Sequence, residues 1–238
     1  MKHPAELWVY LSTSPLLWLT LTLFAWIFAV SISVRLNRHP LANPVLISIV
    51  VLSCTLQLFG VPYQKFFEGA QFIHFLLGPA TVAIAVPLFR QWRQVRQALV
   101  PMVAALIVGS LSAALSIMLM GSWAGLPRDV LISFLPKSAT AGVAMAISSS
   151  LGGNPSLTAV LVVLTGIVGA LVVTPFMNAM RIKNYAARGF AVGLTSHGIG
   201  TARAFDVDRT AGLFAGIAMA LNAIATSLVV PLLVRLFL

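Results

Sequence analysis

Residues 16–34 read LLWLTLTLFAWIFAVSISV, a run in which every side chain is apolar or carries a hydroxyl group. A helix of this length rises about 28 Å, which is close to the ~30 Å hydrocarbon thickness of a bilayer. Three further uncharged runs occupy residues 98–123, 155–180 and 211–234. Soluble core helices are rarely so long and so uniformly apolar. The pattern predicts a helical protein that crosses a membrane several times.

The composition supports the membrane prediction. The 238 residues are 59% hydrophobic and 8% charged, whereas a soluble domain carries roughly 25% charged residues. The net charge of +10 would suggest a nucleic-acid partner in a soluble protein. Here the basic residues lie in short gaps between apolar runs, so they indicate membrane orientation and no nucleic acid is expected. The single cysteine excludes a disulfide framework.

The alternation of apolar runs and short gaps predicts a single all-α polytopic domain over the whole chain, residues 1–238. Further segments are expected near residues 44–61, 70–89, 130–151 and 188–205, giving about seven or eight membrane segments in all. Strongly basic gaps should face the cytoplasm, which places the N-terminus outside. These gaps hold Arg35, Arg38 and His39; Arg90, Arg93 and Arg96; Arg181, Lys183 and Arg188; and Arg235.

Segment 130–151 decides whether every basic gap can face the same side. A full crossing would turn the gap after residue 180 outward, against the charge bias. Pro136 and Lys137 interrupt the segment, and non-helical backbone at membrane depth needs protein or water around it. We therefore predict that segment 130–151 is re-entrant.

Two stretches of the chain resemble each other. Asn43-Pro44-Val45-Leu46 opens one predicted span, and Asn154-Pro155-Ser156-Leu157 opens another. With the topology above, they predict inverted repeats over residues 43–121 and 154–237. Each repeat contains a helix-breaking pair, Gly78-Pro79 in the first and Gly198 with Gly200 in the second. Paired breaks in inverted repeats are typical of transporters and mark the substrate site.

Lys137 is the most informative charged residue, because its neighbours are neutral and largely apolar. An ionisable side chain at membrane depth is costly and is a functional candidate by default. An ammonium group there needs an anion or a set of carbonyl groups. The alternative is a lysine whose side chain reaches the membrane interface.

The stretch Ser196-His197-Gly198-Ile199-Gly200-Thr201-Ala202-Arg203 is the second candidate site. A broken helix exposes N–H groups that attract anions. His197 can exchange a proton near neutral pH, and Arg203 can bind a carboxylate with two N–H groups. The alternatives are a histidine that packs in the core and an arginine paired with Asp206 or Asp208 at the interface.

The sequence lacks the residues and motifs that several functional classes require. All five acidic residues lie in or beside predicted gaps, so no carboxylate pair can relay cations at mid-span. The chain has no phosphate-binding loop, no nucleophile elbow and no metal-ligand cluster. We expect no enzyme, no cofactor and no metal site. Lys, Arg, His and hydroxyl groups suit a small anion instead.

Specific motifs resemble the LrgB/CidB family of bacterial membrane proteins over residues 40–235. They are LLGPATVA (76–83), AVPL (85–88), PKS (136–138), GGNPSLTAV (152–160), ARG (187–189) and SHGIGTARA (196–204). The family usually continues Pro-Lys-Ser with Val-Thr-Thr-Pro-Ile-Ala, whereas residues 139–144 read ATAGVA here. The second proline of the family motif is therefore missing here.

The resemblance implies a place in the bacterial cytoplasmic (inner) membrane and two functional hypotheses. One is transport of small monocarboxylates, namely glycolate and glycerate as in a related plastid carrier, or pyruvate as in bacterial members. The other is an antiholin-like or holin-like modulator of murein hydrolase export and cell lysis. Expected partners are a smaller LrgA/CidA-like membrane protein, the lipid bilayer and a small carboxylate, with a homo-oligomer as a further possibility.

The transport hypothesis assigns a role to each candidate residue. Lys137 and Arg203 would hold the carboxylate, and His197 would handle a coupled proton. The breaks at Gly78-Pro79 and Gly198-Gly200 would face each other near the midplane. Hydroxyl groups of the substrate would be bound by Ser138, Thr140, Ser196 and Thr201.

Overall fold

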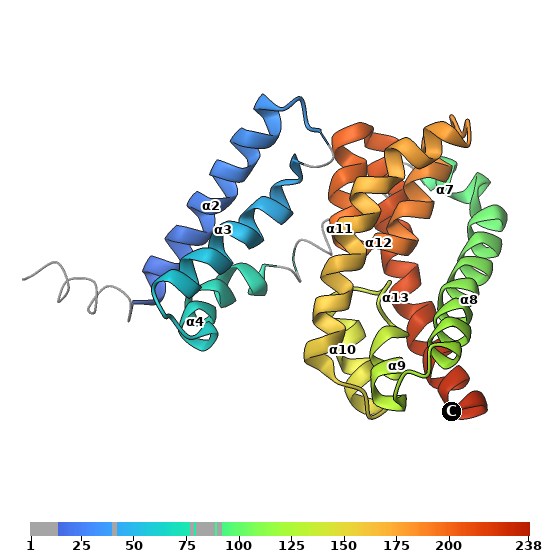
Figure 1. The fold of residues 1–238 in the computed structure, drawn as a ribbon. Coiled ribbons are helices and arrows are strands. Elements are labelled where there is room, and N and C mark those ends of the chain that lie inside the picture. Colours follow the sequence, from blue (N-terminus) through green and yellow to red (C-terminus); the bar gives the residue numbers. More distant parts are fainter. Residues whose placement is uncertain (1–13, 40–41, 77–78, 80–88, 90–91) are drawn as a thin grey trace, which may run out of the picture. The chain divides into compact units, whose positions relative to one another are not determined.

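The structure is a computed structural model that describes residues 14–39, 42–76, 79, 89 and 92–238. Helices are the only regular elements in these ranges, which confirms the predicted all-α class (Figure 1). The chain divides into two compact units, Met1–Ala85 and Val86–Leu238.

The first unit contains, in its described part, α2 (Pro15–Arg35), α3 (Pro44–Leu58) and α4 (Tyr63–Phe75). α2 packs against both α3 and α4. Trp18 of α2 is only 1% exposed and meets Phe66 of α4 edge to face at 6.2 Å. Gly69 of α4 allows this approach, because a Cβ there would overlap the carbonyl oxygen of Pro15. Most of the predicted span 70–89 lies outside the described residues.

The second unit holds the longer helices. In chain order they are α7 (Trp92–Gln97), α8 (Leu99–Trp123), α9 (Arg128–Phe134), α10 (Ala141–Ser150), α11 (Pro155–Ala179), α12 (Tyr185–Val207) and α13 (Arg209–Phe237). α8, α11 and α13, together with α2, are long and apolar enough to cross a bilayer. They also direct large apolar side chains outward: Val100 is 79% exposed, Leu119 71% and Leu228 69%. Such surfaces are typical of helices in contact with lipid.

α9 and α10 form a helical hairpin, hairpin A (residues 128–150), where the sequence predicts a re-entrant segment. The helices have 7 and 10 residues, so they rise about 10 and 15 Å and neither can cross a bilayer. Gly121, near the end of α8, packs on Leu131 of α9. A Cβ at Gly153, just before α11, would lie 3.1 Å from Oγ of Ser133. The chain therefore enters and leaves hairpin A at the same end of the unit.

α12 is a second helical hairpin, hairpin B, although its backbone is helical almost throughout. Ser196 (φ −128°, ψ 15°) and His197 (φ 41°, ψ −134°) interrupt the helix. In a continuous helix, residues 192 and 200 would be about 12 Å apart along the axis. Here a Cβ at Gly200 would lie 2.9 Å from Cγ2 of Val192. Residues 185–195 and 198–207 are thus two arms that fold back on each other.

Hairpins A and B enter the second unit from opposite ends. Hairpin A precedes α11 and hairpin B follows it, so the 25-residue helix α11 separates their bases (Figure 1). The tip of hairpin A, residues 135–140, and the break at residues 196–197 consequently point toward each other. Each hairpin also packs into its own apolar cluster on α13. Hairpin A contributes Leu135 and Ile147 beside Val230 and Leu233, and hairpin B contributes Phe190 and Leu194 beside Leu213 and Phe214.

Hairpin B is attached closely to the start of α13. Gly189 and Gly193, one turn apart, face the carbonyl oxygens of Ala211 and Ala215, which leave no room for a Cβ. Small residues at this spacing let two helix backbones approach closely in a membrane. The first arm of hairpin B and the N-terminal part of α13 therefore pack backbone to backbone.

Candidate functional site

The two hairpin tips meet at Asn222, in the middle of α13. Its side chain is 1% exposed, and Nδ2 donates hydrogen bonds to the carbonyl oxygens of Ser138 (3.1 Å) and Leu194 (3.0 Å). Its Oδ1 accepts hydrogen bonds from Oγ of Ser110 (2.9 Å) and Oγ1 of Thr226 (3.4 Å). One amide group thereby joins α8, both hairpins and α13.

The breaks in the hairpins explain why these carbonyl groups need Asn222. In a continuous helix the Leu194 carbonyl would accept the N–H of residue 198, but the backbone changes direction at Ser196 and His197. Ser138 lies between α9 and α10, outside both helices. A buried carbonyl without a partner costs about 1–3 kcal/mol. Asn222 satisfies both of them.

A cavity of about 460 Å³ opens where the two tips meet. It is lined by Ala113, Phe134, Lys137, Ser138, Leu161, Leu164, Thr165, Val168, Gly169, Thr195 and Ser196. Lys137 is the only charged residue in this lining, and no residue of the described chain forms an ion pair or hydrogen bond with its ammonium group. We call this space the Lys137 cavity.

Hydroxyl groups line the same cavity from three elements. Ser138 comes from the tip of hairpin A, Thr165 from α11, and Thr195 and Ser196 from hairpin B. The Thr195 and Ser196 hydroxyl oxygens are 3.2 Å apart. Ser196 lies so close to α11 that a Cβ at Gly169 would overlap its hydroxyl. The cavity thus combines one positive charge, several hydroxyl groups and apolar walls.

His197 fixes the turn of hairpin B and does not line the Lys137 cavity. Its Nε2 lies 2.8 Å from the carbonyl oxygen of Val162, and because a carbonyl only accepts, this geometry assigns the proton to Nε2. A Cβ at Gly166 would lie 2.6 Å from Cε1 of the ring. Thr201 donates its hydroxyl to the His197 carbonyl at 2.8 Å. The His197 side chain thus connects the turn to α11, whereas the Thr201 bond lies within hairpin B.

The remaining candidates lie elsewhere. Thr140 is the N-cap residue of α10 and is not part of the cavity lining. Arg203 lines a separate small cavity between hairpin B, α11 and α13, with Arg188 and Val207. The non-helical dihedral angles fall on residues 196–197, just before the predicted glycines Gly198 and Gly200, which belong to the second arm. The predicted opposite break cannot be placed, because Gly78 lies outside the described residues.

The structure therefore brings three predicted residues together, namely Lys137, Ser138 and Ser196. Asn222, which connects the tips, is absent from the predicted site. Its signal in the sequence is a single amide within the uncharged run 211–234. A buried polar residue in a spanning helix usually has a partner or a function.

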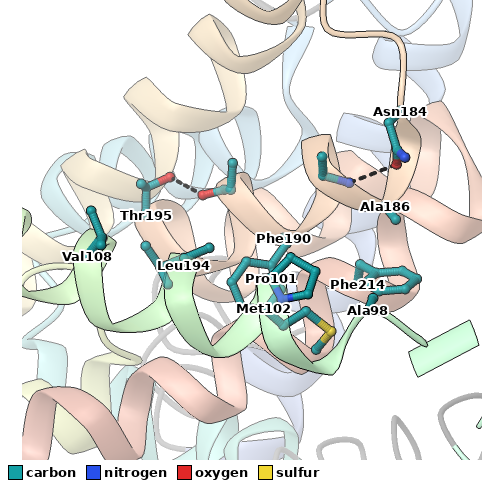
Figure 2. A pocket seen from close by; sticks show the side chains of 14 residues that line it. Ala98, Pro101, Met102, Val108, Asn184, Ala186, Phe190, Leu194, Thr195 and Phe214 are labelled. Atoms are coloured by element: carbon teal, nitrogen blue, oxygen red, sulfur yellow. Dashed lines mark hydrogen bonds between the residues drawn. The ribbon is translucent and has the colours of Figure 1, made fainter. Parts of the chain in front are cut away.

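A second, apolar cavity of about 570 Å³ lies between α8 and the first arm of hairpin B (Figure 2). Figure 2 shows Ala98 and Asn184 at one end of it, and Val108, Leu194 and Thr195 at the other. Pro101, Met102 and Phe190 lie between these ends, and Phe214 lies beside Ala98. We call this space the apolar cavity.

A sequence model described as the LrgB-like family matches residues 22–236. The chain belongs to the LrgB-like family. Similar proteins include the uncharacterized proteins YxaC and YwbG of Bacillus subtilis. YxaC is 35% identical over 83% of this chain and 86% of its own length. YwbG is 34% identical over 90% of this chain and 95% of its own length.

A further LrgB-like relative is the holin-like protein CidB of Staphylococcus aureus, 29% identical over 93% of this chain and 96% of its own length. No solved structure matches the chain. With its long apolar helices, this LrgB-like chain is a multi-pass membrane protein of the holin/antiholin-like family.

Proposed function

We propose that this LrgB-like protein carries small monocarboxylate anions across the bacterial cytoplasmic membrane. The observation that supports the proposal is the Lys137 cavity between the tips of two opposed hairpins. Transporters commonly bind their substrates at such interruptions near the bilayer midplane, because broken helices free backbone polar groups there.

The chemistry of the cavity favours a small anion with one charge. An ammonium group removed from water is costly unless an anion compensates it. Lys137 has no such partner among the described residues, so a bound carboxylate would supply one. Hydroxyl groups of Ser138, Thr165, Thr195 and Ser196 suit the keto or hydroxyl oxygen of pyruvate, glycolate or glycerate. Apolar walls suit the short carbon chain.

A second candidate function rests on the similarity to the holin-like protein CidB. The chain would then be an antiholin-like or holin-like modulator of murein hydrolase export and cell lysis. This function predicts an oligomer that makes the membrane leaky to many solutes, without saturation. It also leaves room for a smaller LrgA/CidA-like membrane protein as a partner, which we include in the proposal for either function.

Reconstitution into liposomes distinguishes the two functions. The vesicles would be tested for uptake of labelled pyruvate, glycolate and glycerate, and for release of an enclosed fluorescent dye. Saturable uptake without dye release would support the carrier. Dye release without saturable uptake would reject the carrier in favour of the holin-like function. Parallel vesicles with the smaller partner protein show whether either activity requires it.

The proposed orientation places the N-terminus outside and the base of hairpin B inside. Because hairpin B returns to its own side instead of crossing, α13 then ends outside, and the prediction that Arg235 faces the cytoplasm does not fit this orientation. Arg181 and Lys183 precede this base, and both are exposed, as expected for a cytoplasmic connection. Labelling of a single cysteine at residue 183 in intact cells tests this assignment. A membrane-impermeant reagent should reach that cysteine only after the cells are broken.

A further inference from the structure

The apolar cavity and the Lys137 cavity follow one another along the same two helices. On α8 the apolar cavity extends from Ala98 to Gly109, and Ala113, one turn later, lines the Lys137 cavity. On hairpin B the apolar cavity extends from Asn184 to Thr195, and Ser196 continues into the Lys137 cavity. The two spaces share Thr195 and lie in succession from the base of hairpin B to Lys137, and we call this succession the track.

Leu194 lines the apolar cavity next to Thr195, the residue that the two cavities share, and it is not part of the lining of the Lys137 cavity. Its side chain is 6% exposed and lies so close to α8 that a Cβ at Gly109 would overlap Cδ2. The Leu194 methyl groups therefore occupy the space that a side chain at position 109 would fill. Thr195, the next residue, lines both cavities.

The backbone of Leu194 is held in place by Asn222. The Nδ2 atom of Asn222 binds the Leu194 carbonyl at 3.0 Å and the Ser138 carbonyl at 3.1 Å. Both hydrogens of this amide are thus used to hold the two hairpin tips together. Leu194 cannot leave Gly109 by a movement of hairpin B unless this hydrogen bond lengthens or breaks.

We propose that Leu194 is a gate between the apolar cavity and the Lys137 cavity, and that Asn222 holds this gate closed. The inference rests on the proposed carrier function, for which it identifies the step that admits the anion. Separation of the hairpin tips releases the Leu194 carbonyl from Asn222 and moves the leucine away from Gly109. The anion can then pass between the Lys137 cavity and the side where hairpin B begins.

Thiol labelling tests the gate without any substrate. Cys54 is the only native cysteine, and Cys54→Ser gives a background without thiols. Thr165→Cys reports on the Lys137 cavity, and Ala105→Cys reports on the apolar cavity. A charged, membrane-impermeant thiol reagent is added to one side of oriented vesicles at a time. When the reagent is added on the side from which it labels the cysteine at residue 105, it should react only slowly with the cysteine at residue 165.

Leu194→Ala should remove the gate. Labelling of residue 165 from the side of the apolar cavity should rise about tenfold or more, as expected when a state populated below about a tenth becomes the main one. Leu194→Met keeps the side-chain volume and should label like the parent. Leu232→Ala is the matched control, because Leu232 is 57% exposed on α13. Unchanged labelling in Leu194→Ala, or fast labelling in the parent, would overturn the gate.

Asn222→Leu, which keeps the branched shape of the side chain but removes both donors, should also raise labelling of residue 165 from that side. Asn222→Ala provides a second variant if the leucine variant does not fold. A folded variant that labels like the parent would remove Asn222 from the mechanism. If vesicles with the unsubstituted protein take up no carboxylate, while the Thr165→Cys variants show labelling that depends on Leu194, the proposed substrate is rejected and the gate is kept.

Discussion

Asn222 and Ser138 are 84 residues apart in the chain, yet Nδ2 of the asparagine donates a 3.1 Å hydrogen bond to the carbonyl oxygen of the serine. The bond joins α13 to the tip of hairpin A, and the same nitrogen atom binds hairpin B through Leu194. A single buried amide group thus determines how the two tips meet beside Lys137.

Asn222→Ala should destabilise the folded protein. The substitution leaves the carbonyl groups of Ser138 and Leu194 and the hydroxyl of Ser110 without their partner. Unpaired buried groups cost about 1–3 kcal/mol each, and partial relaxation leads us to expect a loss of about 2–4 kcal/mol in total. Thermal unfolding in detergent measures it. Ser227→Ala is the control, since Ser227 is exposed and bonds only within α13; equal midpoints for the two variants would contradict the role of Asn222.

Lys137→Gln should weaken carboxylate uptake. The variant keeps most of the side-chain length but removes the positive charge from the cavity, so KM should rise by about tenfold or more, the equivalent of about 1.4 kcal/mol. Lys137→Arg should retain part of the affinity because it retains the charge. Uptake into liposomes measures both. The control is Lys65→Gln on α4, where the lysine is exposed. Wild-type KM in Lys137→Gln would rule out this anion site.

Gly169→Ala should disturb the tip of hairpin B. A Cβ at position 169 would overlap the hydroxyl group of Ser196, which is buried and has little room to move. Overpacking of this kind costs about 1–3 kcal/mol, so both the unfolding midpoint and carboxylate uptake should fall.

Gly142→Ala is the matched substitution for that experiment. Gly142 lies within α10 and no atom would approach a Cβ there within 4 Å. Alanine is a better helix former than glycine by about 1 kcal/mol, so this variant should be as stable as the parent or more stable. A Gly169→Ala protein that also gains stability would show that the contact with Ser196 is not tight.

His197→Asn separates a structural role of the histidine from a role in proton transfer. Asparagine tolerates the positive φ of 41° at this position, but it loses the ring contact with Gly166 and the hydrogen bond to Val162. We expect a lower unfolding midpoint with an unchanged dependence of uptake on a pH gradient. Loss of that dependence in a folded variant would instead assign the coupled proton to His197.

The sequence predicted the spanning helices well because a helix that crosses the lipid must be long and uncharged, and both properties are visible in the sequence. Uncharged runs and the Asn-Pro starts located α3 and α11 almost to the residue, and Asn43 and Asn154 do cap these helices. A proline and a lysine that interrupt an apolar segment predicted a break within residues 130–151, and α9 and α10 are separate helices there. Hairpin B was expected only as a broken helix, since a reversal within one helical segment depends on two dihedral angles that no pattern reveals.

Some residues of the candidate site could not be predicted from the sequence. Lys137 stood out because a charge is costly in lipid, and Ser138 and Ser196 lie next to recognisable motifs. Thr165 and Thr195 did not stand out, because hydroxyl groups in spanning helices can bond to their own backbone and occur without function. Asn222 lay within an apolar run, and only the fold shows that two distant carbonyl groups converge on it.

The attachment of each hairpin to the helix that follows it has a consequence for biosynthesis. Ser133 of hairpin A accepts the N–H of Asn154 and, through its carbonyl, the hydroxyl of Thr158, both at the start of α11. Hairpin B similarly rests on Ala211 and Ala215 of α13. Each hairpin is synthesised before the helix on which it packs. The nascent chain therefore folds as two successive units, hairpin A with α11 and then hairpin B with α13. Asn222 follows both hairpins in the chain, so the two tips can be joined only after α13 has been synthesised.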